Sequence, residues 1–121
     1  MAIPVLVADD SKLSRRSVIR SLPPELEYDI TEATNGQEAI DALSDNTYSL
    51  LLLDLTMPEK DGVDVLKYLD ERGDMPNVIV ISADFQPEKQ RIVLSLGAKR
   101  FIRKPLDKEE LAMTLFELGY L

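Results

Sequence analysis

Acidic, hydroxyl and ammonium side chains follow four of the apolar runs in this sequence, and they are the residues best suited to chemistry. Asp9 and Asp10 follow the first run and Asp54 follows the third. Ser82 ends the fourth run, and Lys104 comes after the fifth. If these runs are parallel strands, their carboxyl ends meet at one edge of a sheet, where open α/β sheets bind ligands. We therefore expect three carboxylates, one hydroxyl and one ammonium to converge there.

Most of these side chains also have a simpler explanation when each is considered alone. The Asp9-Asp10 pair precedes a predicted helix, and Asp is a common N-cap residue. Ser82 suits a turn, and Lys104 could be an ordinary solvated lysine. Asp54 differs, because it follows four leucines and precedes a fifth. Its carboxylate is therefore expected at the end of a buried strand, where a charged group needs a partner that offsets its charge. Independent accidents would not place all of these groups on one rim, which favours a common site.

Three carboxylates within a few ångströms cannot all stay ionised without a cation, because like charges raise each other's pKa. A hard, oxygen-preferring ion resolves that repulsion. Mg²⁺ fits best, since it accepts few carboxylates and commonly completes its coordination with a phosphate oxygen. Lys104 adds a positive point charge suited to a phosphoryl group.

Composition narrows the classes of function. The 121 residues include no Cys and no His, which excludes disulfides, thiolate or imidazole metal sites and a phosphohistidine carrier role within this chain. The formal net charge of −8, from 22 acidic and 14 basic residues, disfavours nucleic-acid binding by this chain. No apolar run has the length of a membrane span or the place of a signal-peptide core, which predicts a soluble, cytoplasmic protein with no membrane partner.

Short apolar runs alternate with amphipathic stretches along the whole chain. Several of the runs lack polar alternation, as expected of parallel strands that are covered on both faces. The predicted strands are Val5–Ala8, Tyr28–Ala33, Leu50–Leu53, Val78–Ile81 and Arg100–Arg103.

Helix signals fill the intervals between these strands. The first helix is predicted roughly over Ser11–Leu22, with Val18 and Leu22 facing inward. Asn35 caps the second helix, with Glu38 three residues on, and Asp107 and Glu110 form a similar pair before the fifth. The third helix carries Val65, Leu66 and Leu69 on its apolar face and is closed by Gly73 and Pro76; the fourth has Pro87 in its first turn and Gly97 at its C-terminal cap.

Five strands alternating with five helices predict an α/β fold, a three-layer α/β/α sandwich around a parallel five-stranded sheet. No repeats, low-complexity tracts or linkers interrupt the pattern. We therefore expect residues 1–121 to form a single domain.

The same residues match a known family. The sequence resembles response-regulator receiver domains, including the single-domain chemotaxis (CheY-like) regulators, over its whole length. The motifs are the acidic pair Asp9-Asp10, the segment Leu51–Pro58 with Gly62, the segment Val80–Ala83 and the segment Phe101–Pro105. None is specific alone, but their order and spacing together make a strong signal. The resemblance implies the flavodoxin-like strand order 2-1-3-4-5.

The resemblance also implies roles for individual residues. Asp54 would be the phosphoacceptor, with Lys104 and Ser82 contacting the phosphoryl oxygens. Mg²⁺, or Mn²⁺ as a substitute, would be held by Asp10, Asp54 and the backbone carbonyl of Thr56. Asp9 would act mainly through bound water. The Lys104–Pro105 bond is expected to be cis.

A switch is implied as well. Movement of Ser82 toward the phosphate would let Phe101 rotate inward and change the surface of the fourth helix, fifth strand and fifth helix. Phe101 stands where many relatives have Tyr, so a plain core role for it remains open. Thr56 and Asp84 occupy the variable positions that influence hydrolysis in relatives.

The partners implied are a histidine kinase or histidine phosphotransfer protein as donor, and a target protein or an output domain outside this sequence as receiver of the signal. The protein would be a regulator that promotes its own phosphorylation and dephosphorylation rather than an enzyme in the usual sense. The alternative is a Mg²⁺-dependent phosphohydrolase with an aspartate nucleophile. That reading is disfavoured, because such enzymes typically carry a second acid where this chain has Thr56.

Two groups of basic residues remain. We expect both to be solvated faces that balance local acid, with partner contact as the alternative. They are Lys12, Arg15, Arg16 and Arg20 on the first helix, and Lys99, Arg100 and Arg103 around the fifth strand.

Overall fold

A computed structural model of the chain describes residues 2–121. Five strands alternate with five helices, as the sequence predicts. The strands are β1 (Ile3–Ala8), β2 (Tyr28–Ala33), β3 (Leu50–Leu53), β4 (Asn77–Ser82) and β5 (Arg100–Arg103). The helices are α1 (Lys12–Arg20), α2 (Gly36–Asp45), α3 (Gly62–Arg72), α4 (Pro87–Ser95) and α5 (Lys108–Glu117).

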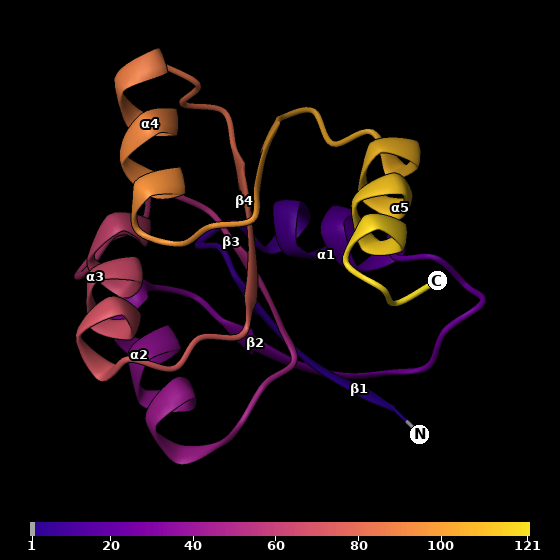
Figure 1. The fold of residues 1–121 in the computed structure, drawn as a ribbon, viewed down its shortest axis with the longest axis horizontal. Coiled ribbons are helices and arrows are strands. Elements are labelled where there is room, and N and C mark those ends of the chain that lie inside the picture. The colour runs from indigo at the N-terminus through magenta and orange to yellow at the C-terminus, as the bar shows by residue number, and fades with distance from the viewer. Residues whose placement is uncertain (1) are drawn as a thin grey trace.

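The strands form one parallel sheet in the order β2-β1-β3-β4-β5. This order is the flavodoxin-like one, and the predicted fold class is confirmed. Helices α2, α3 and α4 cover one face of the sheet, and α1 and α5 cover the other (Figure 1). Right-handed crossovers between parallel strands produce this three-layer arrangement.

The four leucines of β3 divide the core between these two layers. Leu51 and Leu53 pack with the residues beneath α2, α3 and α4, whereas Leu50 and Leu52 pack with those beneath α1 and α5. Successive side chains of a strand point to opposite faces of the sheet. A central strand covered on both faces therefore needs an unbroken apolar run, and this chain supplies one.

The helix ends refine the sequence prediction. α1 is shorter than the predicted Ser11–Leu22, because Ser11 is its N-cap and accepts from the backbone N–H of Ser14. Val18 and Leu22 are buried, as predicted. Asn35 caps α2 as expected, but the Glu38 carboxylate accepts from the backbone N–H and hydroxyl of Thr34 instead of from Asn35.

Two further caps differ from expectation. Asp107 caps α5 by accepting from the backbone N–H of Glu109, without a reciprocal bond from Glu110. α3 has a full capping box that the sequence analysis did not identify: Asp61 and Asp64 each accept from the other's backbone N–H. Within residues 2–121, no helix is both long enough and apolar enough to cross a membrane.

Candidate functional site

Backbone hydrogen bonds continue past the ends of the strands and fix the residues that follow them. The N–H of Asp54 donates to the carbonyl of Ala8 on β1, and the N–H of Asp9 donates to Ala33 on β2. The N–H of Lys104 donates to the carbonyl of Ser82 on β4. The predicted site residues are therefore part of the sheet's hydrogen-bonding pattern, which sets where their side chains begin.

The three predicted carboxylates do converge. One oxygen from each of Asp9, Asp10 and Asp54 lies within 4.8 Å of the others. Asp9 and Asp54 are 3% and 7% exposed, while Asp10 is exposed to solvent. Two buried acids and one exposed acid thus form a pocket with an all-oxygen donor set, which suits a hard divalent cation such as Mg²⁺.

Lys104 directly follows β5, the edge strand of the sheet, and its side chain reaches the same pocket. Its ammonium lies 2.9 Å from Asp9 Oδ2 and 3.5 Å from Asp54 Oδ1, and its side chain is 24% exposed. The interpretation of Lys104 as an ordinary solvated lysine is therefore wrong. The Lys104–Pro105 peptide bond is cis, as predicted.

The electrostatics of the pocket are unfavourable to charge on Asp54. Burial raises the pKa of the Asp54 carboxyl from 3.8 to about 6, with Lys104 opposing the shift and Asp9 adding to it. A single ammonium does not offset the loss of water around this carboxylate together with the neighbouring negative charge. A bound divalent cation would supply the missing positive charge, so the residues fit the metal that the sequence analysis expects.

Ser82 ends β4 at the same edge of the sheet, with its side chain buried. Its hydroxyl oxygen accepts from the backbone N–H of Asp84 at 3.0 Å, so the start of the β4–α4 loop folds back onto it. Thr56 lies exposed two residues after Asp54, in the loop between β3 and α3.

The β4–α4 loop also contacts β5 through a pair of side chains. The Arg103 guanidinium stacks over the ring of Phe85, with its carbon 3.6 Å from the ring centroid. Phe101 lies on the same face of β5, partly buried against the core beneath α2, α3 and α4. A plain core role for Phe101 and a switching role are both compatible with that position.

Glycines bring the backbones around the site close together. A Cβ on Gly62 would lie 2.5 Å from the backbone oxygen of Asp54, and one on Gly36 would lie 2.0 Å from that of Lys60. The N-terminus of α2 therefore packs directly on the β3–α3 loop, and the N-terminus of α3 packs on Asp54 itself.

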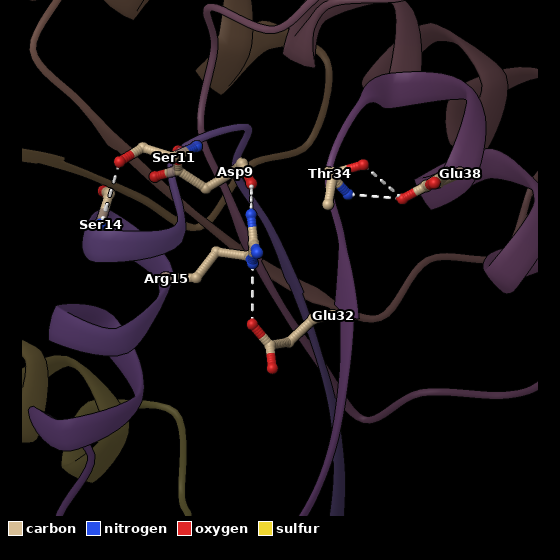
Figure 2. A network of polar contacts seen from close by, with 7 residues as sticks. All are labelled: Asp9, Ser11, Ser14, Arg15, Glu32, Thr34 and Glu38. Atoms are coloured by element: carbon tan, nitrogen blue, oxygen red, sulfur yellow. Dashed lines mark hydrogen bonds and ion pairs between the residues drawn. The ribbon is translucent and has the colours of Figure 1, made fainter.

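One basic residue departs from the sequence prediction. Arg15 does not belong to a solvated face: its side chain is 11% exposed and it forms an ion pair with Glu32 of β2 (Figure 2). Arg15 also donates to the backbone oxygen of Asp9. The sequence shows Arg15 as one of several basic residues on a helix, and nothing local distinguishes it from the others.

Comparison with known proteins agrees with this geometry. A family model described as the response regulator receiver domain matches residues 5–116. Response regulator RR06 of Streptococcus pneumoniae is 38% identical over 101 residues, which are 84% of this chain and 46% of that protein. The transcriptional regulatory protein SrrA of Staphylococcus aureus is 34% identical over 113 residues, 93% of this chain and 46% of its own. The chain thus spans about half the length of these curated relatives.

Solved structures of receiver-type proteins also resemble this chain in fold. The receiver domain of Francisella response regulator 1452 superposes with a TM-score of 0.82 at 31% identity, covering 96% of this chain and 95% of its own. A chain in the CheX–CheY–BeF3–Mg²⁺ complex from Borrelia burgdorferi superposes with a TM-score of 0.87 at 29% identity, covering 96% of this chain and 88% of its own.

Proposed function

Because this chain belongs to the family of response regulator receiver domains, the phosphorylation-dependent switches of two-component signalling, we propose that it accepts a phosphoryl group on Asp54. The proposed domain comprises residues 1–121. One observation carries the proposal: Asp54 is a buried carboxylate at the end of the central strand, with two acids and an ammonium around it. Such an arrangement serves a reaction in which negative charge enters the pocket.

The acidic pocket is proposed to hold Mg²⁺, with Mn²⁺ as a substitute. Asp10, Asp54 and the backbone carbonyl of Thr56 would be its ligands, and Asp9 would act mainly through water. When bound, the ion supplies positive charge for the phosphoryl oxygens during transfer. Support comes from the all-oxygen cluster and from the raised pKa of Asp54, which a cation would lower again.

The proposed transfer step uses the donor chemistry that the family implies. A carboxylate oxygen of Asp54 would attack phosphorus in a phosphohistidine, which must belong to a partner because this chain has no His of its own. The new O–P bond gives an acyl phosphate as the P–N bond breaks, and the leaving imidazole nitrogen keeps the electron pair and takes up a proton. Lys104, already 3.5 Å from Asp54, would move its ammonium onto the phosphoryl oxygens.

The readout would use Ser82 and Phe101. The Ser82 hydroxyl, at the end of β4, now accepts from the backbone N–H of Asp84 in the β4–α4 loop. Turning it toward a phosphoryl oxygen would remodel the β4–α4 loop and let Phe101 move inward, changing the surface of α4, β5 and α5. This is a two-state equilibrium biased by contacts that exist only in the phosphorylated form.

The proposed partners are those that the family implies. The donor is proposed to be a histidine kinase or histidine phosphotransfer protein. The signal would pass to a target protein or to an output domain outside this sequence, as the coverage of the curated relatives suggests. The net charge of −8 argues against nucleic-acid binding by this chain itself.

The test is the intact mass of the protein after incubation with Mg²⁺ and phosphoramidate, with Asp54→Asn beside it. We expect one phosphoryl adduct that requires Mg²⁺, is removed by hydroxylamine and is absent from the variant. Asp64→Asn, which removes a carboxylate from the cap of α3, serves as the control and should still form the adduct. A wild-type protein that gains no phosphoryl group with any divalent metal would refute the assignment of Asp54.

A further inference from the structure

Arg15 makes two contacts that connect α1 to the ends of two strands. Its Nε donates to Glu32 Oε1 at 2.7 Å, and its Nη1 donates to the backbone oxygen of Asp9 at 2.8 Å. Figure 2 shows the guanidinium between these two residues, with α1 on one side and β2 on the other. Arg16, the next residue of the helix, is exposed.

The hydrogen bond from Arg15 to the Asp9 backbone oxygen also constrains Asp10, because that oxygen belongs to the peptide group that joins the two residues. A peptide group is planar, so holding its oxygen also fixes the direction in which the Asp10 backbone begins. This matters because, within residues 2–121, no hydrogen bond holds the exposed Asp10 carboxylate in place. Asp9, by contrast, has its carboxylate held by the Ser11 backbone N–H and by Lys104.

Glu32 explains why the positively charged guanidinium of Arg15 can lie beside a pocket that is proposed to bind a metal ion. It pairs with Val7 in the sheet register, and its carboxylate neutralises the guanidinium. The pair therefore adds no net charge that would oppose a metal ion. Its contribution is geometric, because the forked guanidinium can hold a carbonyl and a carboxylate at once, which a lysine ammonium does less well.

We propose that Arg15, aimed by Glu32, is a positioning residue of the acidic pocket. It holds the Asp9–Asp10 peptide group so that the Asp10 carboxylate is presented beside Asp54 before a divalent cation arrives. This inference rests on the proposed cation site. Residues that support metal ligands in this way typically change metal affinity by about 10- to 100-fold when they are removed.

Isothermal titration with MgCl₂ alone tests the proposal, using wild type, Arg15→Met and the matched control Arg16→Met. Both substitutions remove one positive charge from α1, and that loss by itself would tighten Mg²⁺ binding. We expect Arg15→Met to weaken binding about 10-fold nevertheless, because the ordering of Asp10 is lost. Arg16→Met should bind Mg²⁺ as tightly as wild type or slightly more tightly.

Thermal unfolding in EDTA, followed by circular dichroism, separates positioning from simple stability. Arg15→Lys keeps the charge and is expected to remain folded even if Arg15→Met does not. Its Mg²⁺ affinity should lie between those of wild type and Arg15→Met, about threefold below wild type. Wild-type affinity in Arg15→Met or, if that variant does not fold, in Arg15→Lys would overturn the positioning role. Failure of wild type to bind Mg²⁺ would instead remove the cation site, and the positioning role with it.

Discussion

Asp54 carries an unusual free-energy cost for a residue in a folded protein. Its carboxyl is buried beside a second acid, which raises its pKa to about 6. Above pH 6 the folded, metal-free protein must keep this buried carboxylate ionised, whereas the unfolded chain ionises it in water. Because the folded-state pKa is the higher one, the destabilisation is absent below the unfolded pKa near 4, develops as pH rises toward the folded pKa, and is complete above about 6.

Asp54→Asn is therefore expected to stabilise the metal-free protein. Asn has nearly the same shape and no charge, so the free energy of unfolding at pH 7.5 should rise by about 3 kcal/mol. This follows because the pKa of Asp54 is raised from 3.8 to about 6 and one pKa unit corresponds to roughly 1.4 kcal/mol. The gain should shrink as pH falls to 5 and largely vanish near 4. Urea unfolding in EDTA, followed by circular dichroism, measures it.

The control for this prediction is Asp70→Asn, which removes an exposed carboxylate from α3. Such a surface change should alter stability by less than about 0.5 kcal/mol at either pH. A loss of stability in Asp54→Asn at pH 7.5 would mean that the bond to Lys104 outweighs the desolvation of the carboxylate.

Single residues also show where sequence reasoning succeeds and where it stops. Asp9, Asp54 and Ser82 could be placed because each one directly follows an apolar run, and parallel strands bring such positions to one edge. Arg15 could not, because its burial depends on Glu32, 17 residues away on another strand. The stacking of Arg103 on Phe85 likewise joins two segments that only the tertiary structure brings together.

At the scale of elements, the site depends on loops held by close backbone packing. Gly36 opens α2, and a Cβ there would meet the backbone oxygen and carbon of Lys60 at 2.0 and 2.5 Å. Neither atom belongs to a flexible side chain, so the contact can be relieved only by moving α2 or the β3–α3 loop. That loop carries Thr56, whose carbonyl is a proposed metal ligand.

Gly36→Ala should therefore destabilise the protein, although Ala ordinarily favours a helix over Gly by about 1 kcal/mol. Overpacking of this kind costs about 1–3 kcal/mol, and we expect a net loss in that range. Ser44→Ala, at an exposed position of the same helix, should be neutral or stabilising by a few tenths of a kcal/mol. Urea unfolding compares the two, and a Gly36→Ala protein at least as stable as wild type would show that the loop yields freely.

The bounds of three strands were predictable because these strands carry strong local signals: Tyr28–Ala33, Leu50–Leu53 and Arg100–Arg103 are observed as predicted. The other two strands are longer than predicted, since β1 begins at Ile3 instead of Val5 and β4 spans Asn77–Ser82 instead of Val78–Ile81. The caps were less predictable, since several polar residues compete for each helix N-terminus. Glu38 bonds Thr34 outside the helix, and the Asp61–Asp64 capping box uses two acids where Glu or Gln is the usual partner.

For the whole molecule, the acidic pocket joins the carboxyl ends of β1 and β3, two neighbouring strands of the sheet's centre. A cation bound there contacts residues that are brought together only in the folded state. Binding to the folded state alone stabilises it by RT ln(1 + [L]/Kd), about 2.7 kcal/mol at 100 times Kd. Mg²⁺ should therefore stabilise the entire domain and not the pocket alone.

We expect Mg²⁺ at about 100 times its Kd to raise the unfolding temperature of wild type by about 10 °C, since a domain of this size gains about 4 °C per kcal/mol. Removing the ion with EDTA should reverse the change. Because the chain has a net charge of −8, any divalent cation also screens general repulsion. The comparison is therefore made at constant ionic strength set with NaCl.

Two double variants separate specific binding from screening. Asp10→Asn with Asp54→Asn and Asp70→Asn with Glu71→Gln each remove two negative charges, so their net charges are equal. Only the first pair lies in the pocket, whereas the second lies on the exposed side of α3. The pocket variant should lose most of the Mg²⁺-dependent rise, and the α3 variant should keep it. Equal rises in both variants would assign the stabilisation to screening of the molecule's overall charge and leave the pocket without a metal.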